Sequence, residues 1–485
     1  MLTQVSSLSL SQSMRLLVTL LLLLGYLPAA AWAYPSYKVH LTALDRVHVD
    51  ASFDAVPEET LFMETGASGR DDGFSGFVQN LTARSADGTP VSPHRDGAVW
   101  KLGGPVLLPL TVSYDIDLSF VHSRWPVGNE QAGYANDRAT YVVSKALFLD
   151  CKQPGQRAIQ FFPNNRWEIA TSWKGAGDTY IATSSDDLLR NVIVFGQFTA
   201  TTVQAGPFSF QIVAFGATAA QQSAISAGLA ATVKQCIRMF PQTPLTHYLV
   251  VLIPGAEDDG ESFLTSFAST LSVPLVPWER IVWLNTIAHE LTHYWIGGLI
   301  TVGDDMEWFD EGFTEYYANL SLVRSGGITP DEFVQKMERH LGAYSYFMSS
   351  PLFSGVSIQG AGKRKGSYRF GIYDAGWTIA WVLDLKIRES SHNRSSLDAV
   401  MTSIFLQATQ TRAPLTPQQF VTALATFLGP GGDTFVQQFI ATRNPIDFGP
   451  ILNELGLEAV GQSYAGELYI RVRQKSELRF SWAGF

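Results

Sequence analysis

Hydrophobic and polar residues alternate along the first third of the chain, a pattern typical of β-strands with one buried face. From Tyr37 to Phe53 an apolar residue stands at nearly every second position. The stretch VSYDIDLSF, residues 112–120, repeats the alternation with serine and aspartate between the apolar positions. Glycine, proline and aspartate turns separate these stretches. We therefore predict an antiparallel β domain over residues 34–205.

The pattern becomes helical after residue 205. An alanine-rich segment, residues 217–240, has high helix propensity and leads into the strand-like HYLVVLI at 247–253. Helical spacing dominates residues 278–345, 371–390 and 396–457. The last residues alternate again, which predicts a terminal β-hairpin built from Leu468, Ile470, Val472, Leu478, Phe480 and Trp482. The fold class is thus α+β, with a mixed domain at 206–390 and a helical C-terminal region ending in a short hairpin at 391–485.

The N-terminus has the features of a secretory signal peptide. Arg15 precedes an apolar run over residues 16–24, and Ala31 and Ala33 satisfy the small-x-small cleavage rule. We expect residues 1–33 to be removed and the protein to be exported to the periplasm or the extracellular medium. An uncleaved anchor is the alternative, but the run is short for a bilayer span. We expect no stable membrane span after signal cleavage.

Composition narrows the classes of partner. The chain has 485 residues, of which 46% are hydrophobic and 16% charged, so it can build several cores and is not disordered. A net charge of -10 argues against nucleic acid, because phosphate binding needs clustered basic residues and the short run 363–365 is isolated. Cys151 and Cys236 form either one disulfide or two buried thiols.

The stretch HELTHYW, residues 289–295, carries the strongest chemical signal. His289 and His293 are four residues apart, so on a helix both imidazoles face one metal ion. Glu290 is offset by one residue, where it reaches a metal-activated water and serves as general base. Catalytic zinc takes three protein ligands and keeps one position open, so a third ligand is required.

Glu311 is the candidate third ligand. It lies 18 positions beyond His293, after a Gly-Gly turn and at the start of a second helical pattern. That spacing lets a second helix pack back with its carboxylate on the metal. Glu315, one turn further, is placed to accept the outward N–H of a ligating histidine. The alternative for Glu311 is a carboxylate that only stabilises the helix N-terminus.

HELTHYW followed by WFDEGFTEYY resembles the gluzincin zinc metallopeptidases. The segments RATYVVSKALFL and IYDAGWTIAWVLDLKIRESSHNRSSLDAVM are similar to the glycyl aminopeptidase family, a relative of aminopeptidase N. The similarity runs with gaps from Tyr37 to Leu457. It implies a thermolysin-like zinc peptidase domain at 206–390, a peptide or protein substrate, and His289, His293 and Glu311 as zinc ligands.

The same resemblance implies two further roles. Tyr373, in the family's Y-x-x-G pattern, would stabilise the oxyanion, and its alternative is a core aromatic. Glu261 in EDDGESF would bind the free α-amino group of the substrate. This match is poor, because Ser262 stands where the family has histidine, and a solvated acidic loop is an equally good interpretation of Glu261. The spacing between His293 and Glu311 is also shorter than the family's.

Three functions follow from the sequence. The leading one is an exported zinc aminopeptidase that uses a Glu-activated water. A second is a peptidase-fold binding or scaffolding protein whose catalysis has decayed, although the ligand and base residues are all present. The third is an endopeptidase of the same clan.

Overall fold

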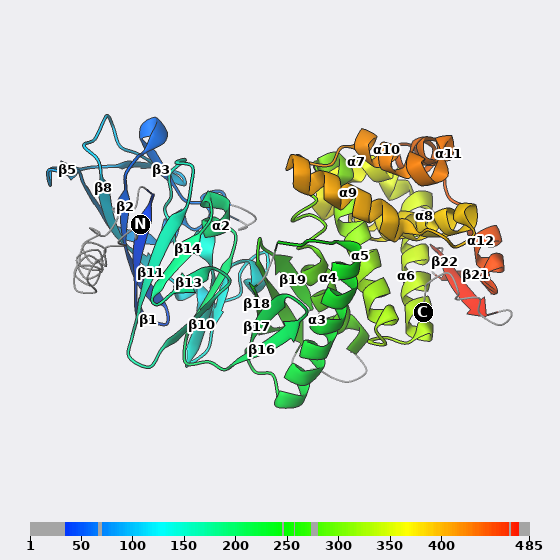
Figure 1. Ribbon diagram of the computed structural model, residues 1–485, viewed down its shortest axis with the longest axis horizontal. Helices are drawn as coiled ribbons and strands as arrows, with labels where there is room; N and C mark the ends of the chain where they lie inside the picture. The colour runs from blue at the N-terminus through cyan, green and yellow to red at the C-terminus, as the bar shows by residue number, and fades with distance from the viewer. Residues whose placement is uncertain are drawn as a thin grey trace, which may run out of the picture.

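The computed structural model describes residues 34–65, 70–244, 247–256, 258–272, 280–464 and 467–474. The predicted signal peptide lies outside these residues. Figure 1 shows the β-rich N-terminal part at one end, a mixed α/β part in the middle and a helical part at the other end. Within the described ranges, no helix combines the length and the apolar character that crossing a membrane needs. The predicted α+β class is confirmed.

The described residues of the N-terminal part form three sheets. The largest has eight strands in the order β13-β14-β11-β1-β2-β8-β4-β5, and a four-stranded sheet has the order β12-β15-β10-β9. A small sheet has the order β3-β7-β6. Their bounds are β1 Ser36–Ala43, β2 Arg46–Phe53, β3 Thr60–Phe62, β4 Val78–Arg84, β5 Pro90–Val91, β6 His94–Asp96, β7 Val99–Lys101, β8 Leu110–Asp117, β9 Gly133–Ala135, β10 Ala139–Val143, β11 Arg157–Pro163, β12 Glu168–Thr171, β13 Lys174–Ala176, β14 Thr179–Ala182 and β15 Val192–Gly196.

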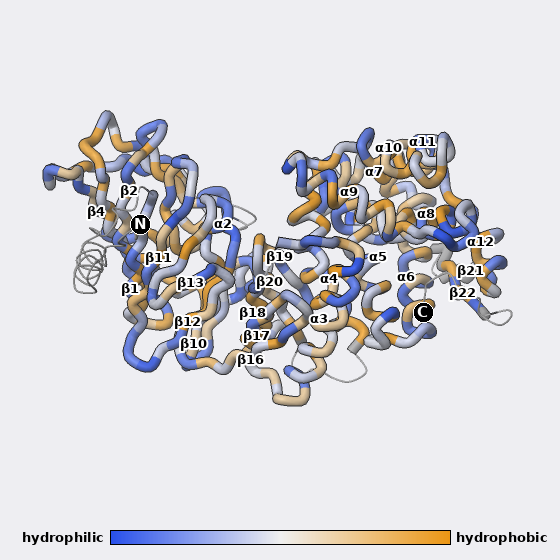
Figure 2. Tube along the Cα trace, in the orientation of Figure 1, coloured by the Kyte–Doolittle hydropathy of each residue, from blue (hydrophilic) through white to orange (hydrophobic). Residues whose placement is uncertain are grey.

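The alternation in the sequence corresponds to burial in these sheets. In β2, the alternate residues Val47, Val49, Ala51 and Phe53 are buried, while the residues between them are partly exposed. Figure 2 shows hydrophobic and hydrophilic positions interleaved along this part of the chain. Not every pairing is antiparallel, because β1 pairs in parallel with β11. A helix, α2 (Ser185–Leu189), lies at one edge.

A five-stranded sheet in the order β16-β17-β18-β20-β19 joins the two halves of the molecule. Its strands are β16 Ala200–Ala205, β17 Phe208–Ala214, β18 His247–Gly255, β19 Asp259–Ser262 and β20 Ser266–Ser272. Strand β18 is buried on both faces: Leu249 and Val251 belong to the N-terminal core, and Val250 and Leu252 to the core under the helices. Such a strand reads as a continuous apolar run, as HYLVVLI does. Strand β16 already belongs to this sheet, so the five-stranded sheet begins a few residues before the boundary that the sequence placed at residue 205.

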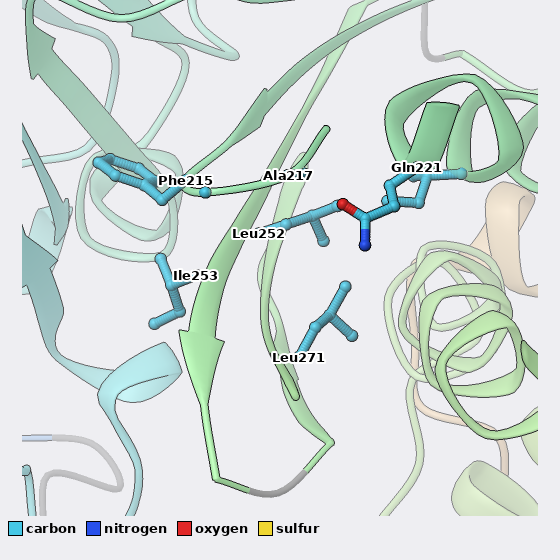
Figure 3. A pocket seen from close by; sticks show the side chains of 8 residues that line it. Phe215, Ala217, Gln221, Leu252, Ile253 and Leu271 are labelled. Carbon is cyan, nitrogen blue, oxygen red and sulfur yellow. The ribbon is translucent and has the colours of Figure 1, made fainter. Parts of the chain in front are cut away.

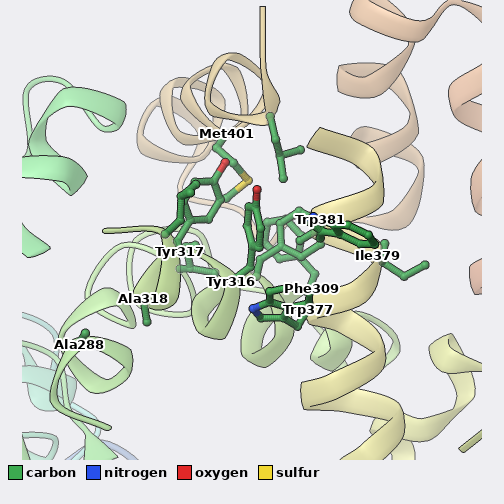
Figure 4. Packing of buried hydrophobic residues seen from close by; sticks show 14 of the residues in the cluster. Ala288, Phe309, Tyr316, Tyr317, Ala318, Trp377, Ile379, Trp381 and Met401 are labelled. Atoms are coloured by element: carbon green, nitrogen blue, oxygen red, sulfur yellow. The ribbon is translucent and has the colours of Figure 1, made fainter. Parts of the chain in front are cut away.

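The helices cover one face of this sheet and extend beyond it (Figure 1). Their bounds are α3 Ala219–Met239, α4 Arg280–Thr292, α5 Glu307–Arg324, α6 Pro330–Ser349, α7 Ile358–Ala361, α8 Ala375–Ser391, α9 Leu397–Thr411, α10 Pro417–Leu428, α11 Pro430–Phe435 and α12 Phe448–Glu454. Figure 4 shows part of their packing, where Tyr316 and Tyr317 of α5 meet Trp377 and Trp381 of α8 beside Met401 of α9. These aromatic side chains are almost entirely buried.

Two details differ from the expectations. The terminal hairpin pairs β21 (Leu457–Tyr464) with β22 (Glu467–Gln474), so the partner of the predicted strand precedes it in the chain. The predicted second strand at Leu478–Trp482 lies outside the described residues. Cys151 and Cys236 are free thiols in two different hydrophobic cores, so the disulfide alternative is wrong.

A small apolar pocket lies between the five-stranded sheet and the start of α3 (Figure 3). Its walls are formed by Phe215, Gly216, Ala217, Gln221, Ile225, Leu252, Ile253 and Leu271. None of these residues is a candidate for the metal centre, so this pocket is separate from the chemistry predicted at His289.

Candidate metal centre

Helices α4 and α5 bring together the side chains of the candidate metal centre. Helix α4 carries His289 one turn before His293, and α5 crosses it with Glu311 facing both rings. The His293 amide still donates to the His289 carbonyl oxygen at 3.1 Å, so the helical geometry that aligns the two imidazoles extends to His293. The apolar side of α4, including Ile287, Ala288 and Leu291, is buried in the core and fixes the direction of the histidines.

Three side-chain atoms meet at one point. The Nε2 atoms of His289 and His293 are 3.0 Å apart, and each lies 3.2 Å from Oε2 of Glu311. A tetrahedral zinc with bonds of 2.0–2.1 Å needs donor atoms about 3.3 Å apart. Two imidazoles and one carboxylate are also the donors that catalytic zinc prefers. The residues present therefore fit a zinc ion, although their assignment as ligands stays a prediction.

Glu315 lies behind His289. Its carboxylate accepts a hydrogen bond from Nδ1 of His289 at 2.9 Å, and it also accepts from Asn285 at 3.0 Å. The Asn319 side-chain amide donates to the same carboxylate at 3.2 Å, and Nε2 of His340 lies 3.4 Å away. Bonds of this kind fix the orientation and tautomer of an imidazole and leave its other nitrogen for a metal. Burial lowers the pKa of His289, but its hydrogen bonds to Glu311 and Glu315 outweigh burial and raise the pKa to about 9.

Helices α5 and α8, which lie beside the metal centre, touch through glycines. A side chain on Gly312 of α5 would come within 2.3 Å of the Gly376 Cα in α8, and one on Gly376 would come within 2.0 Å of the Trp308 carbonyl oxygen. Only glycine allows the two backbones to pack this closely. The contact holds Glu311, next to Gly312, close to Tyr373, three residues before Gly376.

Tyr373 lies in a π-helical turn, Phe370–Asp374, at the start of α8. Its ring stacks on that of His289 with centroids 5.9 Å apart. Burial raises the pKa of Tyr373 well above its ordinary value, and Glu311 raises it further. The phenol therefore keeps its proton and is available as a hydrogen-bond donor beside the histidines. The Tyr373 side chain is partly buried, and it packs against the helical core as well as against His289, so its role as oxyanion donor stays a prediction.

Glu290 lies between α4 and the edge strand β19. A side chain on Gly260 of β19 would meet the Glu290 Cγ at 2.4 Å, so the strand packs directly on this carboxylate. The Ser262 hydroxyl donates to the Glu290 carbonyl oxygen at 3.3 Å. Burial raises the pKa of Glu290 to about 7, and the charges of His289 and His293 oppose this rise. A carboxylate with a pKa near neutrality can both take and return a proton.

Glu261 is part of strand β19, where it pairs with Ala268 of β20. It is partly buried, and burial raises its pKa, while the charges of Lys145 and Lys365 oppose that rise. The interpretation of Glu261 as a member of a solvated loop is therefore wrong, because the residue belongs to an ordered strand. Glu257 lies outside the described residues.

Lys365 was not among the sequence candidates. Its ammonium group pairs with Oε1 of Glu311 and lies 3.2 Å from Glu307. The two oxygens of Glu311 thus have different partners, one facing the histidines and the other facing a cation. Glu307, Asp310 and Glu311 form a second acidic group, and there Lys365 already supplies a cation to Glu307 and Glu311. The sequence showed the basic run 363–365, but it did not show that this run lies beside Glu311.

Two other groups near the site were missed. Asn285 lies four residues before His289 on the same helix, so helical spacing could have identified it. Glu130 lies in a short turn, Asn129–Gln131, of the N-terminal part, where its side chain is inaccessible and its Oε1 has no hydrogen-bond partner among the described residues. Burial raises the pKa of Glu130 to about 7, and the charges of Asp259 and Glu261 raise it further.

Comparison with known proteins agrees with the resemblance found in the sequence. Residues 282–351 match the model of the M61 glycyl aminopeptidase family. No curated protein sequence matches the chain.

Solved structures share the fold over most of the chain. An aminopeptidase N family protein from Idiomarina loihiensis has a TM-score of 0.75 and 18% identity, and the match covers 88% of this chain and 79% of that one. An M1 zinc metallopeptidase from Deinococcus radiodurans has a TM-score of 0.55 and 15% identity, with 85% and 94% covered. At these identities the likeness establishes the fold.

Proposed function

We propose that this zinc metallopeptidase, whose residues 282–351 match the M61 glycyl aminopeptidase family, is an exported aminopeptidase. The observation that carries the proposal is the convergence of the two histidine Nε2 atoms and Glu311 Oε2 at separations of 3.0 and 3.2 Å, beside the buried Glu290. His289, His293 and Glu311 would hold the zinc. When bound, zinc supplies the Lewis acid that polarises the scissile carbonyl and activates water.

Glu290 is the general base. Its pKa of about 7 lets it accept a proton from the attacking water and return that proton to the leaving amine. Tyr373 is the oxyanion donor, because its pKa is raised and its ring lies against His289. Glu315 orients His289 and takes no direct part in the chemistry.

Strand β19 is the proposed binding site for the substrate backbone. It is the last strand of the five-stranded sheet, so its outer edge can pair with an extended peptide. Gly260 brings that edge against Glu290, and Glu261 follows it. A substrate ammonium paired with Glu261 is thereby held near the base, which limits cleavage to the amino-terminal residue.

Hydrolysis of matched peptides with free and acetylated amino termini tests the proposal. The purified, zinc-loaded protein should cleave the free-amine peptides and leave the acetylated ones intact. Glu261→Ala should lower kcat/KM for free-amine peptides about tenfold or more, because a charge-assisted contact is lost. Asp259→Asn is the matched control, since it removes an exposed acid from the same strand and should change the rate little.

The other functions predict different results. An endopeptidase cleaves the acetylated peptides as well, and Glu261→Ala then affects both kinds equally. A decayed binding protein cleaves neither, even when metal analysis finds one zinc per chain. That last outcome would refute the proposed activity, while equal effects on both peptide kinds would refute only the role of Glu261.

Export rests on the predicted signal peptide. Its test is the amino-terminal sequence of the protein recovered from outside the cytoplasm of its host. The expected first residue is Tyr34, and protein that keeps residues 1–33 in the cytoplasm would contradict export.

A further inference from the structure

A basic segment, residues 363–369, borders the metal centre. It contains Lys363, Arg364, Lys365 and Arg369 in a chain that has 34 basic and 44 acidic residues. The segment overlaps the irregular turn Gly362–Ser367 and leads into the π-helical turn that holds Tyr373. A side chain on Gly362 would meet the Asp304 carbonyl oxygen at 1.8 Å, so the segment starts in backbone contact with the residues that precede α5.

The cations of this segment have different partners. Lys365 is neutralised by Glu311 and Glu307. Arg364 stacks on Tyr368 at 5.3 Å and donates to its hydroxyl at 3.0 Å. Arg369 is exposed and places its guanidinium 4.6 Å from the centre of the Tyr373 ring. Among the described residues, no carboxylate forms an ion pair with Arg369.

Arg369 is therefore a cation with unused donors at the edge of the site. Its guanidinium covers Tyr373, and the Tyr373 ring in turn lies 5.9 Å from the His289 ring. Arg369 is not among the main charges acting on Glu261, whereas Lys145 and Lys365 are. The site thus has an acid on the β19 side and an unpaired guanidinium on the Tyr373 side.

We propose that Arg369 binds a carboxylate of the substrate on the leaving-group side of the scissile bond, an inference that rests on the proposed function. A planar guanidinium binds carboxylates through two parallel hydrogen bonds. An extended peptide advances about 3.3–3.6 Å per residue, so a carboxylate one or two residues beyond the cleaved bond lies about 4–7 Å further on. That is comparable to the 4.6 Å between the guanidinium and the Tyr373 ring.

This assignment defines a substrate class. A terminal carboxylate in that position belongs to a dipeptide or tripeptide, and the side chain of an acidic residue after the cleaved bond offers the same group. The enzyme is then selective for short or acidic peptides. Glu261 recognises one end of the substrate and Arg369 the other.

Four dipeptides test the assignment: Ala-Ala, Ala-Ala amide, Ala-Glu amide and Ala-Gln amide. The wild-type enzyme should have a kcat/KM about tenfold higher for Ala-Ala than for its amide if the terminal carboxylate is bound, because a charge-assisted contact is gained. A similar preference for Ala-Glu amide over Ala-Gln amide assigns the acidic side chain as a source. Arg369→Gln should abolish whichever preference exists by lowering kcat/KM for the acid more than for its neutral counterpart, because a neutral substrate has no charged contact to lose.

Arg364→Gln is the matched control, because it removes a guanidinium of the same segment that stacks on Tyr368 instead of Tyr373. It should keep the preference. Arg369→Lys should keep part of it, since the charge remains and the bidentate geometry is lost.

Three results would overturn the assignment. Equal rates for acids and amides in the wild type would show that no carboxylate is bound, while the aminopeptidase activity stands. An equal loss on all four dipeptides in Arg369→Gln would show that Arg369 only positions Tyr373. If the zinc-loaded wild type cleaves none of the four, the proposed function fails and the assignment fails with it.

Discussion

Replacement of Glu315 by glutamine separates zinc binding from catalysis. In the structure the Glu315 carboxylate accepts from His289 Nδ1 at 2.9 Å and from Asn285 at 3.0 Å. The side chain is only 10% exposed. Glu315→Gln keeps the shape but removes the charge, and its single oxygen can no longer serve all of these donors.

The size of the effect follows from these contacts. A hydrogen bond to a charged group contributes about 1.5–3 kcal/mol and a neutral one about 0.5–1.5 kcal/mol, so the loss is about 1–1.5 kcal/mol. Solvent screens little at this exposure, and loss of a negative charge near a dication acts in the same direction. Such outer partners are typically worth 10- to 100-fold in metal affinity. We expect Glu315→Gln to bind zinc about tenfold more weakly or worse.

Competition with a coloured zinc chelator measures this affinity directly, without any peptide. Asp150→Asn is the matched control, because Asp150 is a buried carboxylate that pairs with Arg157 in the N-terminal part. That variant should lose stability and keep its zinc affinity. Unchanged zinc affinity in Glu315→Gln, with circular dichroism showing a native fold, would refute the orienting role of Glu315.

Three further outcomes are expected at the same centre and beside it. Glu290→Gln should bind one zinc per chain by metal analysis and lose most turnover, and loss of the metal would instead make Glu290 a ligand. Tyr373→Phe should lower kcat by about 10²-fold or more with little change in KM, whereas an unchanged kcat would exclude it as the oxyanion donor. In the wild type, the folded state keeps the Glu130 proton up to a pH of about 7, while the unfolded chain releases it near its ordinary pKa of 4.5, so stability is lost as pH rises between these values. Glu130→Gln should therefore gain up to about 3 kcal/mol over wild type in urea unfolding at pH 8 and little at pH 5, and an equal difference at both values would contradict the raised pKa.

Some features of the candidate metal centre could be predicted from the sequence because they depend on local geometry. His289 and His293 share one helical face by their spacing, and Glu315 follows Glu311 by one turn. The strand pattern of residues 37–53 was readable for the same reason, since alternation reflects the two faces of a single strand. The terminal hairpin shows the limit: alternation identified β22, but its partner β21 came from the segment before it, and strand partners are a property of the pair.

The sequence by itself thus determined which residues are candidates for metal binding and where the main helical regions and the first strands lie, because both depend on neighbours within a few positions of the chain. Tertiary structure decided where distant groups meet. Glycines at 312 and 376, which the sequence shows only as motif positions, bring Tyr373 to the metal helix through backbone contact. Lys365 reaches Glu311 from 54 residues away, and Glu261, predicted either to bind the substrate amine or to lie in a solvated loop, belongs to a strand. Such contacts depend on how whole elements pack, and residue type and spacing do not encode that packing one segment at a time.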